Sequence, residues 1–361
     1  MTTKLTKTQR LARKICDDPQ VTDVLFGGGA GGGKSFFVCI WALLQMWKYP
    51  GIRIGLGRKQ LTKLKQSTLV TLLAEVHPFM GVKQHEFNYQ QQSGQIIYKN
   101  GSSLQFVDLA HQPSDPNCDR FGSMLLTHVI VEEVGEVDKK ERDVFISRKN
   151  RFLNDVYGIV GKSISTCNPS QNYIKQEYYK PYAKLGGGEY QKWEYGQVEI
   201  GGEMKPAYRA FIRSLAADNT YISKNYIEVL KKMPDPERKR LLDGNWDYED
   251  DDSILFKNTT IDRAMSRTIN GGDRFIGVDI ADAGNDRTVL SLVEGNMLVD
   301  QKELNIDKTT AIGEQIAMEI IKYAQQNGID ILHSNQIGID VIGVGASTRD
   351  FLRSKNWSVK E

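Results

Sequence analysis

The stretch Gly28-Gly29-Ala30-Gly31-Gly32-Gly33-Lys34-Ser35 has the G-x-x-x-x-G-K-[ST] spacing of a phosphate-binding loop. The apolar residues 24–26 precede it, and an apolar, helix-like segment at 36–47 follows it, which is the strand–loop–helix order that the motif requires. Glycines let backbone N–H groups surround a triphosphate, Lys34 can reach the β- and γ-phosphates, and Ser35 can hold Mg²⁺. The stretch therefore predicts a site for ATP with Mg²⁺. The alternative, a glycine-rich linker, leaves the flanking strand, the lysine and the serine unexplained.

The bulk composition is typical of a globular chain of about two domains. The chain has 361 residues, of which 40% are hydrophobic and 25% are charged, which is enough to build packed cores. Its 47 basic and 45 acidic residues leave a net charge of +2. Any contact with nucleic acid would therefore have to come from local basic patches, because the field of the whole molecule is weak.

The cysteines and the apolar stretches bear on the cellular compartment. Cys16, Cys39, Cys118 and Cys167 are scattered and show no C-x-x-C spacing, which indicates reduced thiols and neither disulfides nor a zinc site. No signal peptide opens the chain, and the longest apolar stretches fall short of the about 20 residues that cross a bilayer. We expect a cytoplasmic protein without a membrane segment.

The pattern of apolar segments predicts two α/β domains. Short apolar strands at 24–26, 52–56, 125–131 and 162–166 alternate with helix-length segments, which is typical of a mostly parallel sheet. Residues 95–98 and 103–107 flank Asn100-Gly101 and predict a hairpin with a type I′ turn, interpreted as an antiparallel excursion from the core. Glycines at 186–188 and 201–202 mark a further antiparallel pair, and a helical stretch at 224–242 is interrupted by two prolines.

The acidic run at 247–252 is interpreted as a linker between the domains. Strands at 274–281, 288–294 and 336–341 and a helix at 308–326 form a second α/β domain after it. The expected division is a P-loop ATPase domain at 1–252, which includes a linker subdomain at about 170–252, and a second domain at 253–361.

An ATPase also needs carboxylates at the end of a neighbouring strand. The apolar run 125–131 ends in Glu132-Glu133, so that Glu132 could act near Mg²⁺ and Glu133 could polarise the attacking water as the catalytic base. Glu132 stands where Asp is more usual. The alternative is a pair of surface acids that follow a core strand.

Five further residues are weaker candidates. Thr166 and Asn168, at the end of another apolar strand, could sense a γ-phosphate, and the amide of Gln9 could bond an adenine edge. Arg148 and Arg151 are candidate arginine fingers that would reach a phosphate on a neighbouring subunit. The ordinary alternative is a loop for Thr166 and Asn168 and a solvated helix face for the two arginines.

Two carboxylates in the second domain suggest a metal site. Asp279 and Asp340 each lie in an otherwise apolar strand, where an unpaired buried carboxylate is costly. Carboxylates from separate strands can converge on divalent metals, as two-metal nucleases require, and Mg²⁺ and Mn²⁺ both suit oxygen ligands. The alternative is that both acids cap loops at strand ends.

These residues, in this order, resemble the large terminase subunit of tailed bacteriophages. The resemblance covers nearly the whole chain, and no single short motif in it is specific. It rests on the Leu-Thr-x-x-Gln element at Gln9, the loop at 28–35, Arg58-Lys59, Arg120-Phe121-Gly122 and residues 129–133. It continues through 166–169, Asp218-Asn219, Gly244-Asn245-Trp246, residues 277–279 and residues 339–345.

The resemblance implies an ATP-driven motor that packages double-stranded viral DNA into a procapsid and an endonuclease that cuts concatemeric DNA. It implies that Thr166 and Asn168 couple hydrolysis to DNA movement, and that Asp279 and Asp340 are metal ligands in a ribonuclease H-like domain. The implied partners are double-stranded DNA, the portal protein, a small terminase subunit and further copies of the chain in a ring. The implied location is the host cytoplasm at the portal vertex, outside the mature virion. Basic segments at 59–65 and 238–240 are candidate DNA contacts or, equally, solvated helix faces.

Two departures from the family qualify these expectations. Relatives often carry an arginine in the phosphate loop, where this chain has Ala30 and glycines, which favours Arg148 or Arg151 as the phosphate-facing arginine. The third nuclease acid of the family is expected well beyond Asp340, and the sequence ends at Glu361. We therefore expect an incomplete, C-terminally truncated nuclease domain and poor DNA cleavage. Two other functions stay open: a helicase-like or repair ATPase fused to a nuclease, and a nucleotide-gated assembly module without turnover.

Overall fold

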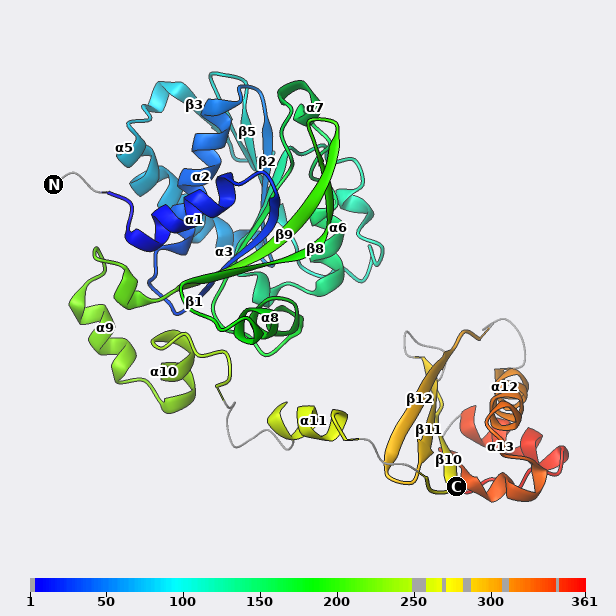
Figure 1. Ribbon diagram of the computed structural model, residues 1–361. Coiled ribbons are helices and arrows are strands. Elements are labelled where there is room, and N and C mark those ends of the chain that lie inside the picture. The colour runs from blue at the N-terminus through cyan, green and yellow to red at the C-terminus, as the bar shows by residue number, and fades with distance from the viewer. Residues whose placement is uncertain (1–3, 249–257, 268–270, 282–286, 307–311, 342–343) are drawn as a thin grey trace. The chain divides into compact units, whose positions relative to one another are not determined.

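The computed structural model describes residues 4–248, 258–267, 271–281, 287–306, 312–341 and 344–361 (Figure 1). The chain divides into two compact units, Met1–Asn258 and Thr259–Glu361. Most of the predicted acidic linker, from residue 249 on, lies outside the described residues.

The first unit is built on a nine-stranded sheet with the strand order β3-β4-β5-β2-β6-β7-β1-β9-β8. Its strands are β1 (Val21–Gly28), β2 (Arg53–Arg58), β3 (Phe87–Gln90), β4 (Gln95–Tyr98), β5 (Ser103–Asp108), β6 (His128–Val131), β7 (Ser163–Cys167), β8 (Tyr190–Ile200) and β9 (Glu203–Ser214). The six strands from β5 to β9 in this order are parallel, and antiparallel strands extend both edges.

Helices cover both faces of this sheet. The α-helices that begin in the first unit are α1 (Lys7–Asp17), α2 (Lys34–Lys48), α3 (Leu61–Gln66), α4 (Thr68–Val70), α5 (His77–Met80), α6 (Lys139–Ile146), α7 (Asn154–Tyr157), α8 (Lys180–Lys184), α9 (Lys224–Lys231), α10 (Asp235–Leu241) and α11 (Asn258–Met265). Single turns and π-helices complete them: η1 (Thr71–Val76), η2 (Gln84–Glu86), η3 (Asp119–Phe121), η4 (Val134–Glu136), η5 (Lys175–Tyr179) and η6 (Ala216–Asp218). Within the described residues, no helix combines the length and the apolar character needed to cross a bilayer.

The strand before the phosphate loop is the centre of the packing. Every residue of β1 is buried, as expected for a strand that lies between two layers of helices. Val24 and Phe26 belong to the core on one face, whereas Leu25 belongs to the core on the other. The alternation of side chains along β1 therefore ties the two helical layers to one strand.

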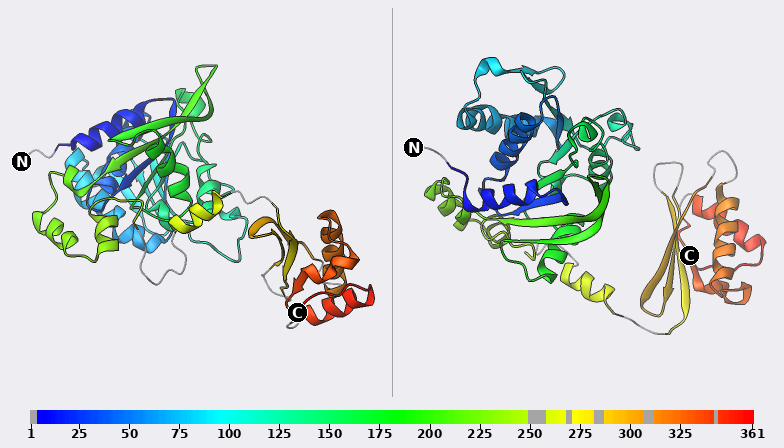
Figure 2. Two further views of the ribbon diagram at one scale, coloured as in Figure 1. Left: turned by 60° about the horizontal axis from the view of Figure 1, so that its bottom comes forward. Right: turned by 45° about the horizontal axis from the view of Figure 1, so that its top comes forward.

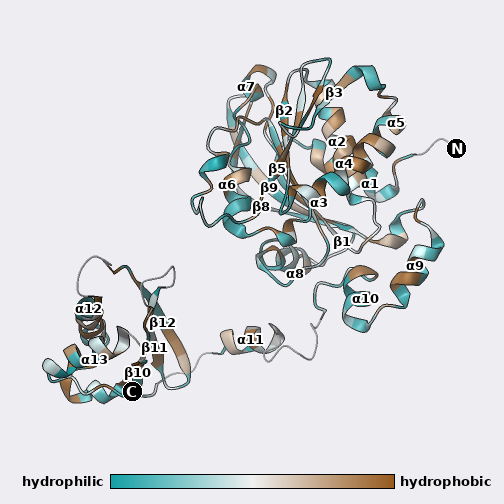
Figure 3. Ribbon diagram, turned by 180° about the vertical axis from the view of Figure 1, so that it is seen from behind, coloured by the Kyte–Doolittle hydropathy of each residue, from teal (hydrophilic) through white to brown (hydrophobic). Residues whose placement is uncertain are grey.

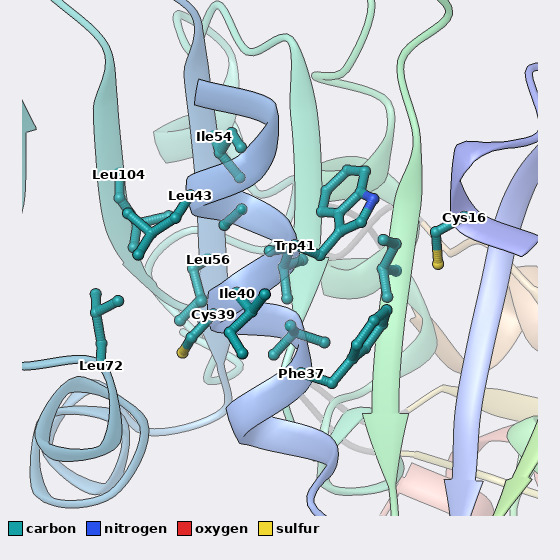
Figure 4. Packing of buried hydrophobic residues seen from close by; sticks show 14 of the residues in the cluster. Cys16, Phe37, Cys39, Ile40, Trp41, Leu43, Ile54, Leu56, Leu72 and Leu104 are labelled. Atoms are coloured by element: carbon teal, nitrogen blue, oxygen red, sulfur yellow. The ribbon is translucent and has the colours of Figure 1, made fainter. Parts of the chain in front are cut away.

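The helix after the phosphate loop is apolar nearly all round. In Figure 4, Leu43 of α2 lies beside Leu104 of β5, on the side of Ile40 and of Ile54 in β2, whereas Phe37 points to the opposite side of the helix, where its ring meets that of Phe26 in β1; much of α2 carries the hydrophobic colour in Figure 3. All of these side chains are at most 1% exposed. A helix that is apolar on more than one face is typical of a buried helix, and α2 is accordingly covered on its outer side by η1, through Leu72.

Aromatic side chains fill the core on the other face. Phe145 of α6, Tyr178 of η5 and Trp246 pack there with Phe211 of β9, and the rings of Tyr179 and Trp246 stack with their centroids 5.4 Å apart. The segment 244–246, which follows α10, is therefore anchored to the first unit.

The structure confirms the predicted α/β class with a mostly parallel sheet, and it corrects the hairpin at 95–107. The two strands do pair antiparallel, but β5 also pairs in parallel with β2 and so belongs to the main sheet. Asn100 does not adopt the positive φ that a type I′ turn requires; only Gly101 does, with φ +82°. The amide of Gly101 donates to the carbonyl of Tyr98 at 2.9 Å, which closes a three-residue loop.

The second unit is a four-stranded sheet with helices on one face. The order is β12-β11-β10-β13, formed by β10 (Arg274–Asp279), β11 (Thr288–Glu294), β12 (Met297–Leu304) and β13 (Ile337–Ile339), with β10 and β13 parallel. The helices are α12 (Ile312–Gln326) and α13 (Val344–Ser354), which lie on the same face in both views of Figure 2, together with η7 (Ile331–Gln336). Ile316 and Ile320 of α12 pack with Leu352 of α13 in its core.

The cores predict the response to truncation of an apolar side chain. Ile164→Ala in β7 removes a fully buried side chain and leaves a cavity, which costs about 2–5 kcal/mol. We expect the thermal midpoint of the first unit to fall by roughly 5–15 °C in calorimetry. Val156→Ala, at a side chain that is 73% exposed, is the matched control and should change the midpoint little. Equal shifts in the two variants would contradict the assignment of Ile164 to the core.

Candidate nucleotide-binding site

The phosphate loop needs glycine at its two ends. Gly28 has φ +138°, and a Cβ there would lie 2.1 Å from the carbonyl oxygen of Ser214. Gly33 has φ +79°, and its Cβ would lie 2.6 Å from Nε2 of Gln9. Side chains at these positions would meet both backbone strain and close contacts, so β9 and α1 fix the shape of the loop from either side.

Lys34 is the first residue of α2 and points back over the loop. It is 7% exposed, and Nζ donates to the carbonyl oxygen of Gly29 at 2.6 Å and to Oδ1 of Asn168 at 3.2 Å. Burial lowers the pKa of Lys34, although Glu133 opposes this shift. The ammonium group thus bridges the loop to the segment after β7, at the end of α2 where an anion is favoured.

The carboxylate of Glu132 joins three segments of the chain. Its Oε2 accepts hydrogen bonds from Oγ of Ser35 at 3.2 Å and from Oγ1 of Thr166 at 2.9 Å. Ser35 is the second residue of α2, Glu132 follows β6, and Thr166 lies in β7, whose neighbour in the sheet is β6. Parallel pairing brings the carboxyl ends of these strands to one edge of the sheet, which is where the loop lies.

Glu132 is a buried acid with one unused oxygen. It is 1% exposed, and within the described residues its Oε1 has no hydrogen-bond partner. Burial, with the adjacent charge of Glu133, raises its pKa to about 7. An unsatisfied carboxylate oxygen beside the serine of a phosphate loop fits the surroundings of a hydrated Mg²⁺ ion.

Glu133 occupies an unusual backbone conformation. Its φ of +49° and ψ of +51° lie in the left-handed region, which a side chain other than glycine adopts at some cost in energy. Its amide donates to Oγ1 of Thr166 at 3.3 Å, and its Oε2 is 3.5 Å from the amide of Asn168. Thr166 therefore contacts both glutamates, and Asn168 contacts Glu133 and Lys34.

Gln9 lies against the loop, with its amide already engaged. Oε1 accepts from the amide of Thr6 at 3.0 Å in the capping box of α1, and Nε2 donates to the carbonyl oxygen of Gly33 at 3.0 Å. Gln9 is 4% exposed, so its immediate role in this structure is to hold the helix against the loop.

Sequence reasoning missed several residues that complete the site. Asn219 donates to the carbonyl oxygen of Gly31 at 2.8 Å, Ser214 donates to that of Gly32 at 3.2 Å, and the amide of Ala30 donates to the carbonyl oxygen of Leu241 at 2.7 Å. Asp218-Asn219 was noted only as part of the resemblance. The other two contacts carry no sequence signal. Ser214 contributes only a hydroxyl group, and the bond between Ala30 and Leu241 uses only the backbone.

A cleft of about 670 Å³ opens over the loop. Its walls combine loop residues, catalytic candidates and apolar or aromatic side chains: Lys4, Gln9, Ala30, Gly31, Gly32, Gly33, Lys34, Ser35, Phe36, Thr71, Glu75, Glu133, Asn168, Asn219, Tyr221, Ile222 and Tyr226. This volume is in the range of small-molecule sites, and the aromatic side chains from 221–226 were not singled out in the sequence.

Arg148 and Arg151 lie elsewhere in the first unit. Both guanidinium groups donate to the carbonyl oxygen of Gly122, at 3.2 and 3.4 Å, and the backbone of both residues bonds to Leu126, before β6 begins. They are thus at the amino end of β6, whereas the phosphate loop is at the carboxyl end of the sheet. Neither lines the cleft of its own chain.

Asp279 and Asp340 come close together in the second unit. Asp279 ends β10, and Asp340 directly follows β13, with Val278 and Ile339 paired in register. The amide of Asp340 donates to the carbonyl oxygen of Val278 at 3.4 Å. Among the described residues no group of three or more His, Cys, Asp or Glu side chains could hold a metal ion.

Comparison of the sequence with protein-family models and with curated proteins gives no match. Comparison of the structure does. The large terminase from a thermophilic bacteriophage aligns with 99% of this chain and 82% of its own, with a TM-score of 0.51 and 13% sequence identity. The fold is that of a phage large terminase. The search also finds the large terminase of bacteriophage HK97, with TM-score 0.48, 11% identity and coverage of 98% of this chain and 79% of that one. A third match is the ATPase domain of the Thermus phage P74-26 large terminase, with TM-score 0.43, 16% identity and coverage of 67% and 94%.

Within this terminase fold, Glu132 predicts a pH dependence of stability. In the folded chain it holds its proton up to about pH 7, whereas in the unfolded chain it titrates near 4.5. Folding therefore takes up a proton between these values, so this group makes the free energy of unfolding fall as pH rises from about 4.5 through 7. Glu132→Gln cannot ionise. In the nucleotide-free chain we expect it to match the original near pH 4.5 and to exceed it at pH 8 by roughly 3 kcal/mol or less.

Thermal unfolding across this pH range measures the effect, with Glu237→Gln on α10 as the control at an exposed glutamate. The control should follow the original chain at every pH. A difference between Glu132→Gln and the original chain that stays constant from pH 4.5 to 8 would refute the assignment to Glu132.

Proposed function

We propose that the chain is the ATPase of a motor that moves double-stranded DNA into a phage procapsid. The observation that carries this proposal is the shared carboxylate of Glu132, bonded by the loop residue Ser35 and by Thr166. This arrangement joins the phosphate loop to the end of a neighbouring strand, as an ATPase requires. The terminase fold of the chain supports the assignment to DNA packaging.

The phosphates of ATP would lie on the loop amides at the start of α2. Lys34 would exchange its bond to the carbonyl oxygen of Gly29 for the β- and γ-phosphate oxygens, and Ser35 would turn from Glu132 toward the metal. Mg²⁺, when bound, neutralises charge on the transferred phosphoryl group. Glu132 would act on this ion through water, since its free Oε1 is buried beside Ser35.

Glu133 would orient and deprotonate the attacking water. It lines the cleft together with Lys34 and Asn168, and its strained backbone directs this residue away from the path of β6. Strain of this kind is retained where the surrounding structure enforces it, often at functional sites. Asn168, bonded to Lys34 and close to Glu133, would report the loss of the γ-phosphate to the segment after β7.

The base and the ribose would occupy the apolar end of the cleft. Tyr221, Ile222 and Tyr226 lie there beside Gln9 and Lys4, and aromatic rings stack on any base. Gln9 would contribute its second amide hydrogen to an adenine edge while keeping its bond to Gly33.

DNA and subunit contacts are assigned by charge and position. Lys59, Lys63 and Lys65 lie at or beside α3, which follows β2 at the carboxyl edge of the sheet, and within the described residues no ion pair engages them. In the second basic segment, Arg238 and Lys239 are paired with Asp235, so we assign DNA contact to the lysines of α3. Arg148 or Arg151 would serve a neighbouring subunit in a ring docked on the portal, with the small terminase subunit as a further partner.

Steady-state ATP hydrolysis, with and without linear double-stranded DNA, tests this proposal. Lys34→Ala removes the phosphate contact and Glu133→Gln removes the base, so we expect each to lower kcat by about 10²–10⁴-fold, and DNA to raise the rate of the original chain. Glu237→Gln is the matched control for loss of one carboxylate and should leave kcat unchanged.

The same assay separates the alternatives. Strand separation would favour a helicase-like enzyme, and tight ATP binding without turnover in the assembled ring would favour a binding switch. Full activity in Glu133→Gln would remove Glu133 from the mechanism.

We also propose that Asp279 and Asp340 are metal ligands of an endonuclease site in the second unit. Their adjacent positions at the ends of β10 and β13 support this assignment, because carboxylates from neighbouring parallel strands meet at one edge. Two-metal phosphodiester cleavage needs ions 3.5–4 Å apart in general, and two carboxylates provide few ligands for such a pair.

A plasmid-cleavage assay with Mg²⁺ or Mn²⁺ measures this activity. We expect slow cleavage or none by the 361-residue chain, since two carboxylates hold a metal pair weakly. Efficient cleavage that Asp279→Asn abolishes would contradict the expectation of impaired activity and would still support the ligand assignment. Efficient cleavage that survives Asp279→Asn would reject the assignment, and Asp300→Asn, in β12, is the matched control.

A further inference from the structure

A second cavity, of about 380 Å³, lies in the first unit away from the phosphate loop. It is lined by Asp23, near the start of β1, and by Ser163, the first residue of β7. Side chains from α6 and the loop after it, and from β8 and β9, complete its walls. The cavity is therefore at the amino ends of the strands, whereas the nucleotide cleft is at their carboxyl ends.

Three cationic side chains line this cavity: Arg142 of α6, Lys149 of the following loop and Arg209 of β9. The carboxylates among the lining residues are those of Asp23 and Asp143. Asp143 is half exposed and pairs with Lys139 at 3.3 Å and with Arg142 at 3.3 Å. The residues that line the cavity thus carry three positive and two negative charges, and Glu177, which does not line it, pairs with Arg142 at 2.7 Å.

The carboxylate of Asp23 is already fully engaged. It accepts from Nε of Arg209 at 2.8 Å, from the hydroxyl of Tyr178 at 2.8 and 2.9 Å, and from Ser163 at 3.0 Å. Burial alone would raise the pKa of Asp23, but the nearby cations outweigh burial and lower it. Asp23 therefore remains ionised, and its acceptor capacity is used by groups of the chain itself.

The cations, by contrast, have donors to spare. Arg142 is 2% exposed; its NH1 donates to Glu177 at 2.7 Å and its NH2 to the hydroxyl of Tyr178 at 3.1 Å, whereas its Nε has no hydrogen-bond partner within the described residues. Nζ of Lys149 donates only over long distances, 3.3 Å to the carbonyl oxygen of Thr22 and 3.2 Å to Oγ of Ser163. NH1 of Arg209 is 3.7 Å from Glu177, beyond hydrogen-bond distance. Burial lowers the pKa of Lys149, which an anion in the cavity would reverse.

We propose that this cavity binds a compact oxyanion of the phosphate type, with Lys149, Arg142 and Arg209 as donors. Guanidinium and ammonium groups together match phosphate oxygens, which accept several charged donors at once. The volume also leaves space for water around such an anion. The oxyanion could be free inorganic phosphate or a phosphodiester of DNA. The proposal does not depend on the ATPase, because none of its residues lines the nucleotide cleft.

Phosphate binding to the full chain tests the site, with Lys34→Ala present throughout to weaken the phosphate loop. In this background we expect inorganic phosphate to raise the thermal midpoint more than chloride of equal ionic strength does. Lys149→Met should weaken phosphate binding at least tenfold in isothermal titration. Lys140→Gln, which removes an exposed charge from the same helix as Arg142, should bind as the parent does.

Double-stranded DNA distinguishes the two sources. If the site holds a phosphodiester, Lys149→Met should reduce the slope of log affinity against log salt by about one, and Lys140→Gln should not. If DNA binding is unchanged while phosphate binding is lost, the ligand is free phosphate.

Equal phosphate affinity in Lys149→Met and its parent would overturn the proposal. A crystal structure of the original chain grown with phosphate keeps the test decisive even if Lys149→Met does not fold. Density for phosphate bonded to Lys149 and the two arginines is expected, and a cavity without it at saturating phosphate would refute the site.

Discussion

The carboxylate of Glu132 is the contact on which the nucleotide site depends. It is buried between α2, β6 and β7 and accepts hydroxyl hydrogen bonds from Ser35 and Thr166. A buried carboxylate is tolerated only when it is bonded or protonated. Within the described residues Oε1 of Glu132 has no hydrogen-bond partner, and burial raises the pKa of this group to about 7. A positive group between the loop and the strand would stabilise the ionised form of this carboxylate. The packing of these three elements therefore meets at this residue.

Parallel strand pairing explains why the chemistry gathers at two ends of the first unit. The phosphate loop, Glu132, Glu133 and Asn168 all follow strands or end them at the carboxyl edge of the sheet. The amino edge instead holds Asp23 with its arginines and lysine. Helices on both faces exclude water from the strands between the edges, so polar groups concentrate where the backbone leaves the sheet.

Residues 214–246 give the loop its second wall. Ser214, Asn219 and the carbonyl oxygen of Leu241 bond to the glycine stretch, and Tyr221 and Tyr226 border the cleft. Trp246 then anchors the end of this segment in the aromatic core. Because α10 touches both Ala30 and, through Arg240, the carbonyl oxygen of Pro169 at 2.9 Å, changes in the loop have a direct physical route to the segment after β7.

The sequence alone determined the phosphate loop, the α/β class and the two glutamates after β6, since each depends on local pattern: glycine spacing, apolar runs and adjacent acids. It also indicated Asp279 and Asp340 as carboxylates in two apolar strands. Only the tertiary structure decided which of these residues meet. Asn168 and Asn219 reach the loop from more than 100 residues away, Thr166 meets Glu132 from the neighbouring strand, and Arg148 and Arg151 lie at the other end of the sheet from the loop. The hairpin at 95–107 was predicted from its local turn signals, but its place in the sheet was not, because those signals do not specify that β5 pairs with β2. Long-range strand order depends on how the two apolar faces of the sheet are covered, and no short stretch of sequence contains that information.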